Sequence, residues 1–184
     1  MQAASVHIID PRDLVEAYCS GYFPMAGSRE GAIGWYSPDP RGILDLNEFI
    51  ISRSLRRTVR KKIFDIRVDT DFENVLRSCS DRAETWISET IVQSYLKLFQ
   101  IGAAHSVETW HKGSLAGGLY GVALGGAFFG ESMFSRMPDA SKAAFVFLVN
   151  RLKNRGYLLL DTQYITPHLK SLGAKEIPRE QYMQ

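Results

Sequence analysis

Hydrophobic and polar positions repeat along the chain with two different periods, which predict a mixture of helices and strands. Apolar residues three and four apart predict helices over 10–21, 52–62, 70–79, 88–102, 139–154 and 166–173. Shorter apolar or alternating runs predict strands over 63–68, 105–110, 115–124, 127–134, 157–162 and 174–177. The turns at 111–114 and 125–126 are short enough for hairpins, so three consecutive strands are expected to form an antiparallel meander.

The helix over 139–154 decides the expected fold. Its side chains are apolar almost all round from Ala143 to Leu152, and a helix without a polar face is buried. Asp139 can cap this helix, and residues 70–73 have the pattern of a capping box for an earlier one. Helices around a mostly antiparallel sheet predict the α+β class. The order of elements resembles the N-acetyltransferase-like (GNAT-like) fold, a mixed sheet with surrounding helices. In that fold, the strands before and after the buried helix separate and leave a cleft.

The first part of the chain is predicted to form a small separate layer. One helix is followed by residues 21–34, which Gly and Pro punctuate as a loop, and then by WYSPDPR at 35–41. Prolines on both sides of Asp39 fix an extended, turn-prone backbone. We therefore expect a small N-terminal domain over 1–38 and an acetyltransferase-like domain over 39–184.

Carboxylate and carboxamide side chains stand at the ends of two apolar runs, where strand ends can direct them into the expected cleft. Glu131 lies in GESMFSR at 130–136, and Asp161 and Gln163 lie in LDTQ at 160–163. The splayed strands would bring these groups together. The crowding of glycines between 117 and 130 would let a ligand or another strand approach the backbone. The alternative is a glycine-rich meander in which Glu131 pairs with Arg136.

The segment SRSLRRTVRKK at 52–62 carries cations and no acid around an apolar stripe of Leu55 and Val59. The cations are Arg53, Arg56, Arg57, Arg60, Lys61 and Lys62. A charged helix face is often only solvated, but such faces usually mix signs. This pattern also suits a polyanion such as nucleic acid, whose binding would then depend steeply on salt. Both interpretations stay open at this point.

Composition limits the remaining possibilities. The 184 residues are 45% hydrophobic and carry a net charge of +2, which fits an ordinary globular protein with a buried core. Cys19 and Cys79 are far apart and the histidines show no ligand spacing, so no disulfide framework, metal site or cofactor is expected. No signal sequence or membrane-length apolar run is present, so we expect a cytoplasmic protein without membrane contact.

The chain resembles the bacterial leucyl/phenylalanyl-tRNA–protein transferase family in ordered blocks: WYSPDPR at 35–41, ISRS at 51–54, GESMFSR at 130–136, ASK at 140–142, DTQ at 161–163 and SLGAKEIPR at 171–179. The resemblance implies an aminoacyltransferase that moves Leu or Phe, and less well Met, from aminoacyl-tRNA to the N-terminal α-amine of proteins beginning with Arg or Lys. This transfer marks those proteins for N-degron degradation. The resemblance also implies a small N-terminal domain before an acetyltransferase-like domain.

With a tRNA donor, each candidate feature gains an expected role. The basic helix would hold the acceptor stem, whose phosphates need charge but no base reading. Asp161 is expected to orient the acceptor amine and to accept its proton, directly or through Gln163, which would also position the ester carbonyl. Glu131 would bind the basic side chain of the acceptor. An apolar pocket for the aminoacyl side chain is expected from Leu119, Phe128, Leu148 and Leu152.

The terminal adenosine of the tRNA is expected to stack on an aromatic side chain. Trp86 is the first candidate, with Tyr95 nearby on the next predicted helix. Family members carry a tryptophan after Phe-Pro in the early loop, where this chain has Met25 after Phe23-Pro24. The resemblance therefore implies a weaker second stacking contact at Met25.

Two other functions compete with this interpretation. An acyl-CoA-dependent N-acetyltransferase would share the fold, but it would need a glycine-rich phosphate loop before the buried helix, and residues 135–142 contain no glycine. A non-enzymatic RNA-binding module would explain the basic helix. It would leave Glu131, Asp161 and Gln163 without a role.

Overall fold

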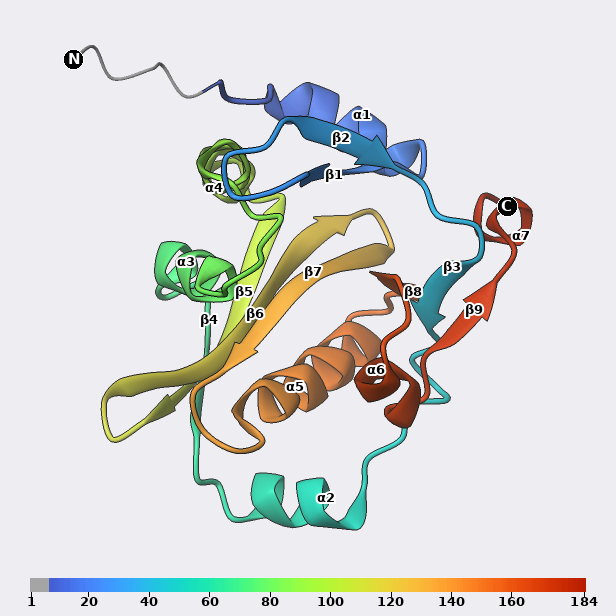
Figure 1. Ribbon diagram of the computed structural model, residues 1–184. Coiled ribbons are helices and arrows are strands. Elements are labelled where there is room, and N and C mark those ends of the chain that lie inside the picture. Colours follow the sequence, from blue (N-terminus) through green and yellow to red (C-terminus); the bar gives the residue numbers. More distant parts are fainter. Residues whose placement is uncertain (1–6) are drawn as a thin grey trace, which may run out of the picture.

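The computed structural model describes residues 7–184 and consists of one large sheet, a separate hairpin and surrounding helices (Figure 1). In chain order the elements are α1 (Pro11–Cys19), β1 (Phe23–Ala26), β2 (Ile33–Tyr36), β3 (Arg41–Leu44), α2 (Arg53–Arg60), β4 (Asp65–Val68), α3 (Phe72–Ser80), α4 (Glu89–Gln100), β5 (Ala104–His111), β6 (Ser114–Leu124), β7 (Ala127–Ser135), α5 (Ala140–Asn154), β8 (Leu159–Gln163), α6 (Pro167–Ser171), β9 (Lys175–Ile177) and α7 (Arg179–Tyr182). The α+β class is confirmed.

The large sheet has seven strands in the order β4-β5-β6-β7-β8-β3-β9. Its strand pairs are antiparallel, except that β7 and β8 run parallel. Parallel neighbours need a crossover connection, and α5 provides it. The predicted meander is confirmed as β5-β6-β7, with pairing from Ala104 to Ser135.

Helices cover both faces of this sheet. On one face, α3 and α4 share a hydrophobic cluster with residues of α1 and β1, including Leu14, Tyr18 and Phe23. On the other face α5 packs on β5, β6 and β7, and its buried side chains include Ala144, Phe145, Leu148 and Val149. The predicted burial of this helix is therefore confirmed. The division into domains at residues 38 and 39 stays a prediction.

Several short elements differ from the sequence-based prediction. Residues 21–34 were expected to form a loop, but β1 and β2 form an antiparallel hairpin that pairs Phe23 with Tyr36. Strand β3 and helix α7 were not predicted at all. Each of these elements is only four residues long, too short for a period to show in the sequence, and β3 gains its stability from pairing with the distant strands β8 and β9.

Two predicted helix caps are wrong. The hydroxyl of Thr70 bonds to the Glu108 carboxylate and not to the start of α3, and Asp71 makes no side-chain cap. Asp139 precedes α5 in a left-handed conformation with φ of 64°, and its carboxylate contacts Lys142 and Thr58 instead of capping backbone amides. In both places, the polar side chain expected to cap the helix instead bonds to a side chain of another element.

Candidate functional site

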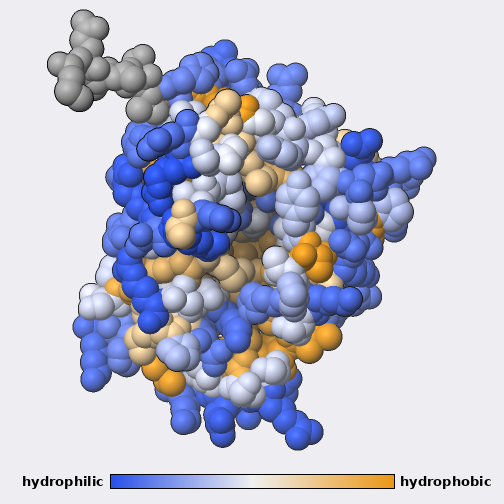
Figure 2. All heavy atoms as spheres, in the orientation of Figure 1, coloured by the Kyte–Doolittle hydropathy of each residue, from blue (hydrophilic) through white to orange (hydrophobic). Residues whose placement is uncertain are grey.

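A cavity opens where β7 and β8 separate. The two strands pair from Ala127–Leu159 to Phe129–Asp161, and pairing stops there. Beyond that point lies a cavity of about 280 Å³. Its walls come from β1, β6, β7, β8, α5, α6 and the loop between α3 and α4. Figure 2 shows a hollow near the middle of this face, with apolar surface inside it and hydrophilic surface around it. The expected cleft between the splayed strands is therefore present.

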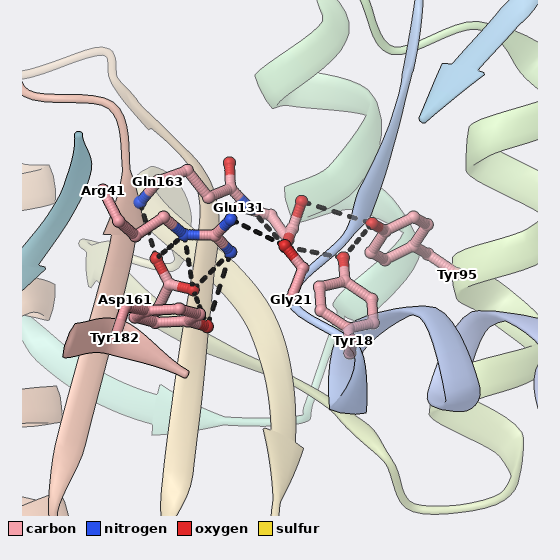
Figure 3. A network of polar contacts seen from close by, with 8 residues as sticks. All are labelled: Tyr18, Gly21, Arg41, Tyr95, Glu131, Asp161, Gln163 and Tyr182. Carbon is pink, nitrogen blue, oxygen red and sulfur yellow. Dashed lines mark hydrogen bonds and ion pairs between the residues drawn. The ribbon is translucent and has the colours of Figure 1, made fainter. Parts of the chain in front are cut away.

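Glu131 on β7 and Gln163 on β8 meet in the wall of this cavity (Figure 3). The Gln163 amide nitrogen donates to Glu131 Oε1 at 2.8 Å. The Tyr18 hydroxyl donates to the same oxygen at 2.7 Å, and the Tyr95 hydroxyl donates to Oε2 at 3.2 Å. Arg136, the alternative partner of Glu131, instead donates to Ser78 and to a backbone carbonyl. The alternative of a structural Glu131–Arg136 pair is therefore wrong.

Burial changes the acid strength of Glu131. The side chain is 8% exposed. Loss of water around the carboxylate raises the pKa of Glu131 from 4.5 to about 7, although the hydrogen bond from Tyr18 opposes the rise. The nearby Asp161 carboxylate raises the pKa further, and the bonds from Tyr95 and Gln163 lower it. Near neutral pH, both the neutral and the charged forms of Glu131 are thus populated.

Asp161 forms a buried ion pair with Arg41, and both side chains are fully buried. Arg41 Nη2 lies 2.6 Å from Asp161 Oδ2, and Nε lies 3.1 Å from Oδ1. The Tyr182 hydroxyl donates to Oδ2 at 2.7 Å. Burial alone would lower the pKa of the Arg41 guanidinium, but the Asp161 carboxylate outweighs this effect and raises it, so the guanidinium stays charged. The guanidinium also lies over the rings of Phe23 and Tyr182, at 4.9 Å and 4.6 Å.

Asp161 also controls the backbone of Gln163. The backbone N–H of Gln163 donates to Asp161 Oδ1 at 2.7 Å. Gln163 has φ of 61°, in the left-handed region that a residue with a side chain rarely occupies. Such strain costs about 1–3 kcal/mol and persists only where surrounding contacts enforce it. The opposing Gly42 permits the close approach, since a Cβ there would lie 3.0 Å from the Tyr164 backbone.

The structure departs from several predicted positions. Asp161 does not line the cavity and is fully buried, so it offers no direct contact to a ligand, and only the indirect route through Gln163 remains. Tyr95 is also fully buried and binds Glu131, so it has no free face on which a base can stack. Phe128 and Leu152 lie outside this cavity and line a smaller one of about 80 Å³. Phe128 belongs to the part of β7 that is still paired with β8, and Leu152 lies one helical turn beyond Leu148.

Other predicted residues do lie in the cavity wall: Met25, Trp86, Leu119 and Leu148. Sequence reasoning missed further wall residues, among them Arg82, Tyr120, Met133, Phe145, His168 and Leu169. It also missed Arg41, Tyr18 and Tyr182, which donate hydrogen bonds to the carboxylates of Asp161 or Glu131. Arg41 ends the WYSPDPR segment, but a segment predicted to form turns gives no reason to expect that its arginine is buried.

The basic segment at 53–62, which contains α2, presents its cations to solvent. All six predicted cations are exposed, and within residues 7–184 none of them forms an ion pair. Only Leu55 of the expected apolar stripe is buried, whereas Val59 is 38% exposed. Thr58 donates to Asp139 at the start of α5, which ties the basic helix to the helix that forms one cavity wall.

A second hollow of about 440 Å³ lies beside this junction, lined by residues 135–139, Ser141, Lys142 and His168. It shares His168 with the first cavity. The described part of the chain contains no cluster of three side chains suited to a metal ion. Within residues 7–184, no helix has both the length and the apolar character needed to cross a membrane.

Comparisons with known proteins agree along nearly all of the chain. The family model "Leucyl/phenylalanyl-tRNA protein transferase" matches residues 43–184, and the model of that family's N-terminal domain matches residues 8–39. A leucyl/phenylalanyl-tRNA–protein transferase of Chlorobaculum tepidum is 54% identical over 180 residues, which cover 96% of this chain and 93% of the relative. One from Rubrobacter xylanophilus is 56% identical over 177 residues, covering 96% and 92%.

A solved structure shows the same fold at low sequence identity. It is a GCN5-related glucosamine N-acetyltransferase region within a fungal multi-domain GH3 β-N-acetylglucosaminidase. The TM-score is 0.51 at 11% identity, with 89% of this chain and 22% of that chain covered. The expected GNAT-like architecture is therefore confirmed.

Proposed function

The chain belongs to the leucyl/phenylalanyl-tRNA–protein transferase family, and from that premise we propose its donors, its acceptors and the roles of its site residues. The protein is an enzyme that transfers an aminoacyl group from aminoacyl-tRNA to protein. The proposed donors are Leu-tRNA and Phe-tRNA, with Met-tRNA less effective. The proposed acceptors are proteins with N-terminal Arg or Lys, which the transfer marks for N-degron degradation in the cytoplasm.

The observation that carries the mechanism is the orientation of the Gln163 amide. The Gln163 NH₂ group donates to Glu131, and this is the orientation that the ionised form of Glu131 requires, because a carboxylate can only accept hydrogen bonds. The amide oxygen then points away from Glu131, and within residues 7–184 it takes part in no hydrogen bond. This oxygen can accept a hydrogen bond from the attacking α-amine and direct the nitrogen lone pair at the ester carbon.

The reaction itself is the aminolysis of an activated ester. The amine nitrogen forms a bond to the carbonyl carbon, the bond from that carbon to the ribose oxygen breaks, and a proton moves from the nitrogen to the ribose oxygen. An α-amine has a pKa of about 7.7–8.0, so a useful fraction is neutral at neutral pH. Holding two reactants in place can supply much of the rate enhancement. Asp161 acts here as a positioning residue, because it holds the Gln163 backbone.

The cavity wall supports an apolar donor side chain. Leu119, Met133, Phe145, Leu148 and Leu169 provide aliphatic and aromatic surface next to Gln163. Such a pocket excludes polar side chains, yet distinguishes one methylene by only about 1–3 kcal/mol. Acceptance of Leu, Phe and Met by one pocket follows from this. Trp86 in the same wall is the proposed stacking surface for the terminal adenosine.

Charge on two sides of the site fits the two substrates. Glu131 in the cavity is the proposed partner of the basic acceptor side chain, and the exposed cations at 53–62 are the proposed contacts of the tRNA phosphates. The hollow that contains Lys142 and His168 lies between α2 and the cavity and offers a path for the RNA end. A plain RNA-binding module would give no role to buried Glu131 and Gln163 in the wall of a mainly apolar cavity.

The decisive experiment is a matrix of donors and acceptors. Labelled Leu-, Phe-, Met- and Glu-tRNA, and acetyl-CoA, are each incubated with peptides that begin with Arg, Lys or Ala. Label is expected on Arg and Lys peptides from Leu- and Phe-tRNA and, more weakly, from Met-tRNA. Transfer only from acetyl-CoA would overturn the proposal in favour of an acetyltransferase. Equal transfer to Ala peptides would overturn the proposed acceptor range.

Variants connect this activity to the named residues. Gln163→Ala is expected to lower kcat strongly, whereas Gln181→Ala, at an exposed glutamine of α7, should leave it unchanged. The double variant Arg56→Glu/Arg60→Glu should raise the KM for aminoacyl-tRNA. The slope of log KM against log salt concentration should become shallower, by the amount expected for the loss of about two phosphate contacts. Lys112→Glu, an exposed lysine in the β5–β6 turn, is the matched control.

A further inference from the structure

Arg82 lies in the wall of the main cavity, although it belongs to the loop between α3 and α4 and not to the sheet. It is the one arginine or lysine among the described residues that line this cavity. Asp81 and Glu84 are on the same loop, but within residues 7–184 Arg82 forms no ion pair with any acid. An exposed cation without an acidic partner at a cavity mouth is available to an anion.

The guanidinium of Arg82 is held in a defined position. Its Nη2 donates to the backbone carbonyl of Met133 and lies 3.5 Å from the Ser132 hydroxyl. Both acceptors are on β7, two residues or less from Glu131. An arginine has five N–H donors, so this anchoring leaves the other edge of the fork free.

The loop that carries Arg82 is also fixed, by the N-terminal hairpin. Arg29 Nη2 donates to the carbonyls of Ser80 and Arg82, at 3.1 and 3.0 Å. The Trp86 carbonyl accepts from the Ala26 N–H at 3.1 Å. Arg82 and Trp86 are therefore presented to the cavity by one loop with a supported backbone. A cation and an aromatic ring four residues apart on such a loop suit a nucleotide, whose base can stack and whose phosphate needs a positive charge.

We propose that Arg82 binds the phosphodiester on the 5′ side of the terminal nucleoside of the donor RNA, while Trp86 stacks on the base of that nucleoside. This inference rests on the proposed function, because it assumes that the aminoacyl ester reaches Gln163. The ester and the 5′-phosphate are on opposite sides of one ribose. With the ester inside the cavity, the phosphate lies at the rim, where Arg82 is placed. His168 is the other wall residue that can carry a positive charge. Burial lowers the pKa of its imidazole, so His168 is mostly neutral at neutral pH.

The test uses Phe-tRNA and a matched pair of small donors that differ only in the 5′-phosphate. The donors are Phe-tRNA, 3′-O-phenylalanyl-adenosine 5′-monophosphate and 3′-O-phenylalanyl-adenosine. Arg82→Gln removes the charge, Arg82→Lys keeps the charge without the planar fork, and Arg12→Gln, at an exposed arginine on α1, is the control. Arg82→Gln is expected to raise the KM about tenfold or more for the two phosphate-bearing donors and to leave phenylalanyl-adenosine within twofold. Arg82→Lys should fall between, and Arg12→Gln should match the wild type.

A loss that is equal for all three donors would overturn the inference, because it would show that Arg82 only holds β7 in place. No change with any donor would overturn it as well. Calorimetric binding of AMP and adenosine separates this result from the proposed function, because it requires no turnover. The wild type should bind AMP about tenfold more tightly than adenosine, and Arg82→Gln should bind both alike. Equal binding by the wild type would refute the phosphate contact, even if transfer activity is present.

Discussion

Replacing Glu131 by glutamine tests the electrostatics of the site. Burial raises the pKa of Glu131 from 4.5 to about 7, so the folded protein binds this proton more tightly than the unfolded chain does. The stabilisation from the protonated form is complete below about pH 4.5 and is lost as pH rises through about 7. At about 1.4 kcal/mol per pKa unit the whole effect is about 3 kcal/mol, of which roughly 2.5 kcal/mol falls between pH 5 and 9.

Glutamine does not titrate, so the variant should lack this pH dependence. We expect the free energy of unfolding of the wild type, measured by urea denaturation, to fall relative to Glu131→Gln by about 2.5 kcal/mol from pH 5 to 9. Changed hydrogen bonds to Tyr18, Tyr95 and Gln163 add an offset that does not vary with pH. Glu84→Gln, at an exposed glutamate without an ion pair in the described chain, is the control variant. A wild-type minus variant difference that stays constant within about 0.5 kcal/mol across this range would refute the reasoning.

The same substitution has a kinetic consequence if Glu131 binds the basic acceptor side chain. The ionised form attracts that cation, so the KM for an Arg-starting peptide should fall as pH rises from 6 to 8 in the wild type. Titration of the acceptor amine affects both enzymes alike and cancels in the ratio of their KM values. A ratio that does not vary with pH would remove Glu131 from acceptor recognition.

Three further outcomes follow from the packing. Arg41→Ala leaves the buried Asp161 carboxylate without its partner, and urea denaturation should show a loss of about 3–5 kcal/mol. Tyr182→Phe removes one hydrogen bond to Asp161 but keeps the ring beside Arg41, so a smaller loss of about 1–2 kcal/mol is expected, with a lowered kcat and an unchanged KM for the donor. Gly121→Ala places a Cβ 2.2 Å from the Phe129 carbonyl oxygen, so the melting temperature should fall by an amount equivalent to about 3 kcal/mol. An unchanged melting temperature would show that β6 can shift to make room. Gly27→Ala, with open space around the added Cβ, is the control.

The sequence predicted the parts of the molecule whose signals are long or locally complete. The apolar run of α5 and the alternating strands of the meander each extend over many residues, and their period identifies them without knowledge of the partners. The order of these elements was then enough to expect separated strands and a meeting of Glu131 with Gln163. The basic segment at 53–62 was also predictable, because a run of cations without acids is visible in the sequence itself.

What could not be predicted depends on contacts between distant positions. Arg41 and Asp161 are 120 positions apart, and neither local pattern indicates that a cation will be buried against that carboxylate. Tyr95 lies on an apolar helical stripe, but whether its hydroxyl points to solvent or to Glu131 depends on β7. Phe128 and Leu148 are both apolar and both near the cleft, yet only Leu148 lines the main cavity. The point where β7 and β8 stop pairing makes that distinction.

The buried ion pair explains why segments from both ends of the described chain meet at β8. Separated strands create a cavity, but they also leave Asp161 at the end of the β7–β8 pairing, where an isolated buried carboxylate would be strongly unfavourable. Arg41 from β3, supported by Phe23 and by the Gly21 carbonyl at 2.9 Å, neutralises it from the N-terminal side, and Tyr182 completes its hydrogen bonds from α7. With both oxygens of Asp161 occupied, its remaining effect is to hold Gln163 in the left-handed conformation. Changes at Tyr182 of α7 should therefore affect turnover through Gln163, although no described residue of α7 lines the cavity.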